Sequence, residues 1–461
     1  MGLESVTALR KVAVAILSWN GKHHLETCLE ALASQHDPGV DWEILVLDNG
    51  STDGTVAWMH ERWGRDRRVR LIESPVNHGF CGGNNRLVAA TGEDVDAVAL
   101  LNNDTRPEPG WLGALVAALG SAPPDVAAVS GKIVDWAGER LDFGRGLMTF
   151  DGHAFQLDYR RPLKRARVPA AGDELPFACG GNMLIRRASF LAAGGFDDDY
   201  FAYLEDVDLG WRLWSGGERV VFAPEAAVHH RSGATSDLLG LYNRGFLFER
   251  NAFLTAYKNY EPGLWERILP AVMLTLTSRT QALLESNPGA EILRIDPYAG
   301  HIANTAGKGA AAPPAPKSVV ELPPATSWEG FKIRWKGYGP REFLRRGLGK
   351  LGGGPPPAAP SPVASSAAAI EPPRLTDERT VAQLRATHWL LNHLDGAAAH
   401  RAEIQKRRRR PDLEIFERFP VYLVPTYPGD HALFASPGFR DWLPKELPVI
   451  EARLEEIMEM G

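Results

Sequence analysis

Three short polar clusters near the start of the chain each follow an apolar run, and their residue types could bind a nucleotide together with a metal ion. They are Ser18-Trp19-Asn20-Gly21, residues 48–54 (DNGSTDG) and residues 102–105 (NNDT). An aromatic ring there can stack on a flat base, and a carboxylate can accept a hydrogen bond from a base N–H. A further aspartate can hold Mg²⁺ or Mn²⁺ against a diphosphate. These residues also make plain turns, but three clusters at successive strand ends weaken that alternative.

The segments that precede the clusters predict how they are positioned. Residues 12–17, 44–47 and 98–101 are apolar on both faces, as strands of a covered parallel sheet must be. Apolar residues at helical spacing lie between and after them, in residues 25–32 and 111–119. This rhythm predicts a doubly wound α/β domain, in which ligands bind beyond the C-terminal ends of the strands.

Composition and charge exclude several classes of protein. The 461 residues include 51 basic and 57 acidic ones, a formal charge of −6, which argues against a dedicated nucleic-acid partner. The three cysteines, Cys28, Cys81 and Cys179, are far apart, so we expect buried free thiols in a reducing compartment. We find neither a signal peptide nor an apolar run long enough for a membrane helix, and expect a cytoplasmic protein, at most attached to the inner face of the membrane.

Composition also divides the chain. We predict a catalytic α/β domain in residues 1–262, a helical extension in 263–305, and a helical segment with an extended tail in 376–461. Residues 306–375 contain two Pro/Ala/Gly-rich linkers around a basic aromatic segment, 328–350. The run Arg407 to Arg410 predicts a solvated helix face or a site that binds an anionic membrane, and segment 328–350 invites the same membrane hypothesis.

Over roughly residues 10–260 the sequence resembles the inverting family 2 glycosyltransferases with the GT-A fold, especially the rhamnosyltransferase-like branch. The resemblance rests on an ordered set of motifs: VAVAILSWNG, EILVLDNGSTDGT, NHGFCGGNNRLVAATG, VALLNNDT and GGNMLIRRASFLAAGGFDDDYFAYLEDVDLGWRLWSGG, followed by His229-His230. It implies a mixed, mainly parallel sheet flanked by helices, with a helical C-terminal extension added in this chain.

The resemblance also implies a donor site and a metal site. Trp19 matches the base-stacking position, Asp48 matches the aspartate that reads the base, and Asp104 matches the last carboxylate of the metal motif. Asn102 replaces that motif's first aspartate, which puts metal dependence in doubt. The implied nucleotide-binding residues are Ser18, Trp19, Asn20, Asp48, Asn77, Gly79, Asn84 and Asn103. The implied cofactor is a divalent cation, Mg²⁺ or Mn²⁺.

The second half of the matched region supplies the acceptor side. Glu205 and Asp206 should begin a helix, where the helix dipole favours ionised carboxylates. The resemblance points to Asp206 as the general base and leaves Glu205 as the alternative, or as an acceptor-orienting group. Both could instead merely cap the helix. Gly181 and Asp198 are expected on the acceptor side, and Gly180-Gly181 could equally be a plain turn.

Two pairs in this half are predicted from spacing. Asp208 and Arg212, four residues apart on one helical face, should form an ion pair. Alternation along an extended segment sends His229 and His230 to opposite sides. We favour His230 as the histidine that completes the metal shell, with His229 as the alternative.

These observations predict an inverting glycosyltransferase of surface polysaccharide synthesis, which uses a nucleoside-diphosphate sugar and a glycan or lipid-linked acceptor. The branch suggests dTDP-rhamnose, while galactose, glucose and N-acetylhexosamines stay open. A sugar-phosphate nucleotidyltransferase and a non-catalytic carbohydrate-binding protein are the alternatives. A nucleotidyltransferase typically needs a Gly-rich loop with a basic residue to hold the triphosphate, and residues 18–22 match that loop poorly. The intact Asp48, Asp104 and Asp206 argue against a non-catalytic protein. A homodimer contact is most natural in the helical C-terminal third.

Overall fold

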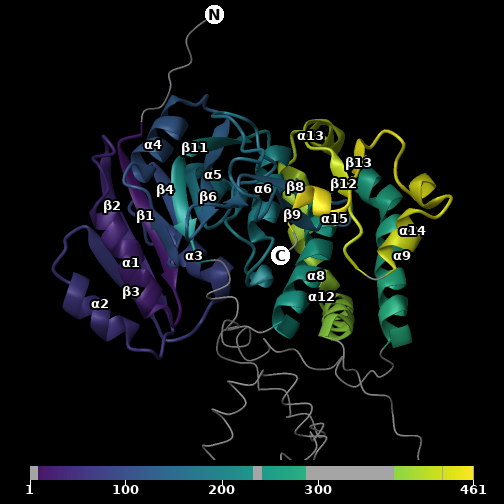
Figure 1. Ribbon diagram of the computed structural model, residues 1–461, viewed down its shortest axis with the longest axis horizontal. Helices are drawn as coiled ribbons and strands as arrows, with labels where there is room; N and C mark the ends of the chain where they lie inside the picture. Colours follow the sequence, from purple (N-terminus) through teal and green to yellow (C-terminus); the bar gives the residue numbers. More distant parts are fainter. Residues whose placement is uncertain (1–8, 232–240, 287–377, 428, 460–461) are drawn as a thin grey trace, which may run out of the picture. The chain divides into compact units, whose positions relative to one another are not determined.

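A nine-stranded mixed sheet forms the centre of the catalytic region. The structure, a computed structural model, describes residues 9–231, 241–286, 378–427 and 429–459 (Figure 1). The two predicted linkers and the segment 328–350 lie outside the described residues. The strands run in the order β3-β2-β1-β4-β10-β6-β11-β5, and β7 pairs with β6. Strands β1 to β4 are parallel, and β10 lies antiparallel between β4 and β6.

The apolar runs identified from the sequence form β1, β2 and β4, three neighbouring strands of the sheet. The first half consists of β1 (Lys11–Ser18), β2 (Asp41–Asn49), β3 (Val69–Ser74), β4 (Ala97–Asn102) and β5 (Thr105–Pro107), with α1 (Lys22–Ala33), α2 (Thr55–Trp63), α3 (Gly79–Ala89) and α4 (Trp111–Ser121) between and after them. Helix α1 buries Leu25, Cys28, Leu29 and Leu32, the four residues at helical spacing. The predicted doubly wound mixed sheet flanked by helices is confirmed.

The second half closes the sheet and carries the acidic motif. It consists of β6 (Val126–Asp135), β7 (Leu141–Phe143), the hairpin β8 (Arg145–Met148) with β9 (Ala154–Leu157), β10 (Asn182–Arg186), α5 (Arg187–Ala193), the short 3-10 helix η1 (Asp198–Tyr200), α6 (Glu205–Ser215) and β11 (Arg219–His230). Helix α6 ends before Gly216-Gly217, as the sequence predicts, and Gly217 has the left-handed φ of 94° that suits glycine. A register shift between Ala223 and Ala227 interrupts β11 before its two histidines.

A helical layer follows, and the C-terminal segment packs on it. Helices α8 (Leu241–Asn259), α9 (Pro262–Ser286) and α12 (Glu378–Arg407) are followed by α13 (Asp412–Arg418), β12 (Val421–Leu423), α14 (Asp430–Phe434), the 3-10 helix η4 (Phe439–Trp442), β13 (Val449–Glu451) and α15 (Leu454–Ile457). In Figure 1 the yellow C-terminal elements lie beside β8, β9 and α9. None of the described helices is both long and apolar enough to cross a bilayer.

The basic run Arg407 to Arg410 is only partly solvated: Arg407 and Arg409 are exposed, whereas Arg408 and Arg410 are half-buried and form intramolecular contacts. Arg408 pairs with buried Asp412 at 2.6 Å, and Arg410 donates to the carbonyl of Trp214 at 2.9 Å. The Arg410 guanidinium also lies 5.0 Å from the Trp214 ring centroid, a cation–π distance. These contacts attach the segment at the end of α12 to α6. The sequence did not predict them, because a run of like charges does not indicate which partners it has in the fold.

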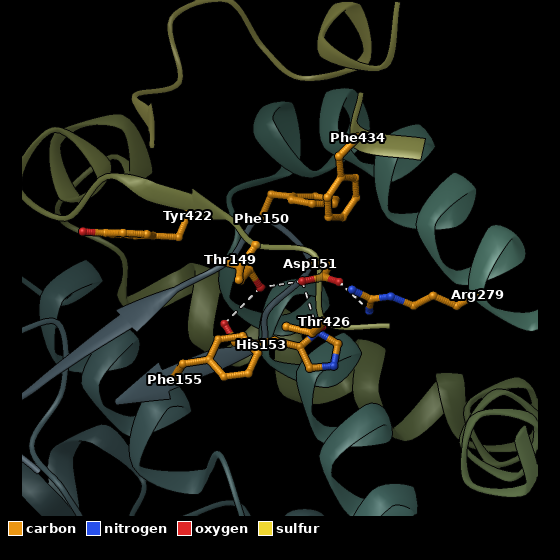
Figure 2. Close-up of a pocket in the computed structure, with 10 residues that line it drawn as sticks. Thr149, Phe150, Asp151, His153, Phe155, Arg279, Tyr422, Thr426 and Phe434 are labelled. Carbon is orange, nitrogen blue, oxygen red and sulfur yellow. Dashed lines mark hydrogen bonds and ion pairs between the residues drawn. The ribbon is translucent and has the colours of Figure 1, made fainter. Parts of the chain in front are cut away.

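A buried ionic network joins the C-terminal segment to the rest of the fold. Figure 2 shows Asp151, in the turn between β8 and β9, lying between Arg279 of α9 and the hydroxyl of Thr149. Arg279 contacts Asp151 at 3.1 Å and Asp430 of α14 at 2.9 Å. His153 contacts Asp151 and Glu249 of α8, and although burial opposes it, these carboxylates raise the pKa of His153 to about 9. Four segments of the chain thus meet in one cluster of paired, buried charges.

We expect Asp430→Asn to lower the free energy of unfolding by about 3 to 5 kcal/mol, because it leaves the buried Arg279 with a charge that one partner no longer balances. Urea denaturation measures this loss. The matched control is Glu446→Gln, which breaks the ion pair between Glu446 and Arg267 of the same helix, but at an exposed site. Exposed pairs contribute about 1 kcal/mol or less, so equal losses in the two variants would contradict the role of the network.

Candidate active site

The polar clusters meet in a single cleft of about 580 Å³ beyond the C-terminal ends of β1, β2 and β4. This is where an open α/β sheet binds its ligands. The cleft contains residues from both halves of the matched region, so it unites positions nearly 200 residues apart. The predicted site residues that line it are Trp19, Asn77, Gly79, Asn103, Asp104, Gly181, Glu205, Asp206 and His230.

Asp48 is followed by Asn49, which lines the cleft. It lies one residue before the end of β2, beside Ser18 in the sheet register, and its Oδ2 accepts the N–H of Ser51 at 3.1 Å. Its Oδ1 is buried and has no hydrogen-bond partner among the described residues. A buried carboxylate oxygen without a donor is costly unless a ligand supplies one. Asp48 therefore has one acceptor oxygen that no described residue satisfies.

Five other predicted residues do not line the cleft, and three of these form hydrogen bonds with the segments around it. Asn20, with φ 50°, donates its backbone N–H to Ser51 Oγ and accepts the N–H of Thr52 through Oδ1, which ties the first two strand ends together. Ser18 Oγ accepts a hydrogen bond from Asn103. Asn84 is buried inside α3, where it donates to the carbonyl of Phe80.

The remaining two are held outside the cleft by other side chains. Asp198 accepts a hydrogen bond from Asn85 at 2.8 Å, so η1 is tied to α3. His229 lies 2.6 Å from Glu108. As alternation along β11 predicts, His230 faces the cleft and His229 does not.

Asn49 is a cleft residue that the sequence reasoning missed. It lines the cleft and holds the loop before α3: its Nδ2 donates to Asn77 Oδ1 at 2.8 Å, and its Oδ1 accepts the N–H of His78 at 2.9 Å. The signal was available, because Asn49 directly follows Asp48 at a strand end. Its partner loop is 28 residues away, however, and only the fold brings the two together.

An aspartate and a histidine converge on the cleft wall where a metal ion would be expected. His230 Nε2 lies 3.3 Å from Asp104 Oδ1, and His230 Nδ1 lies 2.8 Å from Asp142 Oδ2. Although burial opposes it, these two carboxylates raise the pKa of His230 to about 10. A carboxylate on the far ring nitrogen is the usual partner of a metal-bound histidine. Asp142 is a second residue that the sequence reasoning missed.

The backbone before Glu205 is strained. Phe201, Tyr203 and Leu204 have φ values of 62°, 71° and 62°, in the left-handed region that non-glycine residues rarely adopt. Asn251 of α8 holds this segment through its Nδ2, which donates to the carbonyls of Ala202 and Tyr203 at 2.8 and 2.7 Å. The same helix therefore fixes the direction in which α6 begins.

Glu205 and Asp206 begin α6 at the cleft, as predicted, but burial outweighs the helix dipole. Asp206 is half-buried and accepts the backbone N–H groups of Gly180 at 3.0 Å and Val207 at 2.9 Å. Burial raises the pKa of Asp206, and these hydrogen bonds limit the rise. Burial and then the charge of Asp206 raise the pKa of Glu205 well above its usual value, and Glu205 Oε2 has no partner among the described residues. The ionised form of Glu205 is therefore disfavoured both by burial and by the neighbouring carboxylate.

The turn that contacts Asp206 is closely surrounded by side chains. A Cβ at Gly181 would lie 2.8 Å from Asn102 Nδ2, and one at Gly180 would lie 3.2 Å from Phe80 Cε1 and 3.3 Å from Glu205 Oε1. A side chain at either position would therefore push against residues that line the cleft. Cys179, just before this turn, lines the cleft and is half-buried, whereas Cys28 and Cys81 are fully buried as expected.

Two other acidic groups near α6 have structural roles. Asp208 is fully buried and pairs with Arg212 at 2.8 Å, which confirms the predicted ion pair, and with Lys258 at 3.3 Å. Asp197, Asp199 and His400 lie close enough together to share a cation. Asp197 already contacts the ammonium of Lys258, so that cluster is neutralised from within the protein.

Comparison with known proteins agrees with this geometry. The family model for glycosyl transferase family 2 matches residues 13–192. The chain is 31% identical over 244 residues to the N-acetylglucosaminyl-diphospho-decaprenol L-rhamnosyltransferase of Mycobacterium tuberculosis, which covers 48% of this chain and 76% of that protein. It is 29% identical over 236 residues to the O-antigen biosynthesis protein RfbC of Myxococcus xanthus, covering 49% of this chain and 18% of that one.

Similarity to solved structures is more distant. The structure of GalNAc-T7 with UDP, GalNAc and Mn²⁺ matches with 14% identity and a TM-score of 0.45, over 58% of this chain and 52% of that one.

The fold and the cleft define an enzyme of the glycosyltransferase class. The chain belongs to glycosyltransferase family 2, and it is similar to the rhamnosyltransferases of that family. The predicted family and enzyme class are therefore confirmed, which favours a glycosyltransferase over a nucleotidyltransferase or a non-catalytic binding protein.

Proposed function

We propose that the protein transfers a sugar from a nucleoside-diphosphate sugar to a hydroxyl of a glycan or lipid-linked acceptor, with inversion at the anomeric carbon. The observation that carries this proposal is that one cleft contains Asp206 at the start of α6 together with the Asp104–His230 pair. The similarity to a rhamnosyltransferase makes dTDP-rhamnose the first donor to test. A cytoplasmic location at the inner face of the membrane and a homodimer stay predictions from the sequence.

In this proposal the ends of β1 and β2 bind the donor nucleotide. The Trp19 ring stacks on the base, and the unpartnered Asp48 Oδ1 accepts a base N–H. Asn49 keeps Asn77 and the start of α3 in place beside the ribose and phosphates. These groups are fixed by hydrogen bonds to one another, so binding the donor would cost little reorganisation.

Asp206 is the general base. Its carboxylate faces the cleft from the first turn of α6, and it takes the proton of the acceptor hydroxyl as that oxygen attacks the anomeric carbon. The bond from that carbon to the diphosphate breaks in the same step, so the configuration inverts. Glu205, which keeps its proton more firmly, orients the acceptor. A positioned base typically contributes on the order of 10² to 10⁴ in rate.

The cleft residues fit a divalent cation. Asp104 and His230 supply a carboxylate oxygen and an imidazole nitrogen within 3.3 Å of each other, and Asp142 fixes the ring from behind. Asn102 would add only a neutral amide oxygen, so the charge of the site rests on Asp104. When bound, Mg²⁺ or Mn²⁺ stabilises the negative charge of the departing nucleoside diphosphate.

We expect Asp206→Asn to lower kcat by about 10² to 10⁴, because the amide cannot accept the proton. Its affinity for the nucleoside diphosphate should stay within about twofold, since Asp206 does not contact that ligand. Turnover assays with dTDP-rhamnose and calorimetry with dTDP measure the two quantities. Near-normal turnover in this variant would show that another group is the base.

The pH dependence of kcat/KM should show an acid limb at a pH above the usual pKa of an aspartate. Activity falls as pH decreases, because Asp206 must be ionised and burial raises its pKa. We expect Glu205→Gln to keep this limb, since Glu205 is already protonated in the active form. Rate profiles of the two proteins test this assignment, and loss of the limb in Glu205→Gln would identify Glu205 as the base.

We expect Asp142→Asn to weaken Mn²⁺ binding in the presence of dTDP by about 10- to 100-fold, as is typical when the carboxylate behind a metal-bound histidine is removed. Calorimetric titration with Mn²⁺ measures this effect without turnover. The control is Glu108→Gln, which removes the corresponding carboxylate from His229 outside the cleft. Equal affinity in both variants would speak against His230 as a ligand.

A further inference from the structure

The start of α3 and the strained segment that precedes α6 meet at Phe201. The carbonyl of Phe201 accepts the backbone N–H of Phe80 at 2.6 Å and that of Cys81 at 3.2 Å, both in the first turn of α3. These N–H groups have no partner within their own helix. Residues 75–78, termed the donor loop because they lead into α3 beside the proposed ribose and phosphate site, are thus followed by a helix that Phe201 caps.

The backbone at Phe201 adopts a rare turn. Its φ and ψ are 62° and −56°, and the N–H of Ala202 donates to the carbonyl of Tyr200 at 2.6 Å. A three-residue turn with this hydrogen bond and these angles is a γ-turn of the kind that is rare because it is strained. Such strain persists only where the surrounding structure holds it, and it is concentrated at functional sites.

The γ-turn and the start of α3 are in close contact. Gly79, the first residue of α3, lines the cleft and has a φ of 70°. A Cβ at this position would lie 2.5 Å from the Phe201 ring and 2.6 Å from the Phe201 carbonyl oxygen. The Gly79 N–H donates in turn to Oδ1 of Asn77 in the donor loop at 2.8 Å. Because the two backbones leave no room for even a methyl group, a displacement of the γ-turn also displaces the donor loop.

Helix α8 holds the γ-turn in place. Asn251 is fully buried, and its Nδ2 donates to three carbonyls of the segment, those of Tyr200, Ala202 and Tyr203. Arg250, beside it in α8, donates to the Tyr200 carbonyl at 2.9 Å. Neither Asn251 nor Arg250 is among the residues that line the cleft. They therefore act on the active site through the backbone that they hold.

We propose that Asn251 is a positioning residue for both halves of the active site. Through the γ-turn at Phe201 it fixes Asp206 at the start of α6 and, at the same time, the donor loop before α3. This rests on the proposed function and extends it, because nucleotide binding then depends on a residue that touches neither substrate. If the two halves were positioned independently, loss of Asn251 would disturb the base and leave nucleotide affinity unchanged.

The test is Asn251→Ala in the full chain. We expect its affinity for dTDP in the presence of Mn²⁺ to fall by about fivefold or more, the lower range of coupling between distinct sites. Its kcat should fall by about 10²-fold, as a displacement of roughly 1 Å can cause. Asn251→Ser, which keeps one donor, should lose less of both, and it provides the measurement if the alanine variant does not fold. Calorimetry and turnover assays on protein shown to be folded by circular dichroism measure the two effects.

The matched control is Thr255→Val. Thr255 is also buried in α8, and its hydroxyl lies 2.9 Å from the Tyr200 hydroxyl, but it does not hold the carbonyls of the γ-turn. This variant removes a buried hydrogen bond of the same helix, so its melting temperature should fall while its dTDP affinity and kcat stay within about twofold. A general loss of stability would affect the two variants alike, and equal losses of dTDP affinity in both would overturn the proposal.

The outcomes separate the proposal from the proposed function. Unchanged dTDP affinity in a folded Asn251 variant would overturn the coupling alone, even if kcat fell. Weakened dTDP binding in Asn251→Ala, together with near-normal turnover in Asp206→Asn, would keep the link to the donor loop and disprove the assigned base. A wild type that binds none of dTDP, UDP and GDP would count against both.

Discussion

The active site depends on a strained piece of backbone that a neighbouring helix holds in place. Left-handed backbone at three non-glycine residues costs of order 1 to 3 kcal/mol each, and Phe201, Tyr203 and Leu204 all adopt it. Hydrogen bonds from the side chain of Asn251 to the carbonyls of Tyr200, Ala202 and Tyr203 offset part of this cost. The start of α6, and with it the position of Asp206, therefore depends on α8, which lies outside the residues matched by the family model.

Two aspartates in the first turn of α6, Asp206 and Asp208, have different electrostatic surroundings. Asp208 is buried between Arg212 and Lys258, and these cations lower its pKa although burial opposes them. Asp206, two residues earlier, is contacted instead by backbone N–H groups. A carboxylate without a neutralising cation keeps a raised pKa and the ability to accept a proton. The same helix thus stabilises the fold through Asp208 and carries the proposed general base, Asp206.

The C-terminal segment is attached by buried charge as well as by apolar packing. Arg408 and Arg410 join α12 and α13 to α6 and α8, and Asp430 joins α14 to α9. Removing one partner of such a contact strongly destabilises the fold, because the other charge is left unpaired in a low-dielectric interior. Firm attachment is what allows Met458, near the end of the chain, to serve as part of the cleft wall.

The sequence by itself determined the apolar strands and amphipathic helices of the first half of the sheet, the family, and the polar residues at strand ends, because these follow from local periodicity and from motifs that are contiguous in the chain. It also predicted the Asp208–Arg212 pair and the opposite directions of His229 and His230, which depend only on helix and strand geometry. Only the tertiary structure decided that Asp142 contacts His230 and that Asn49 hydrogen-bonds to Asn77. It also decided that Arg408 and Arg410 form intramolecular contacts and that Met458 lines the cleft. Each of these joins residues that no local periodicity relates, so the contact exists only once the chain has folded.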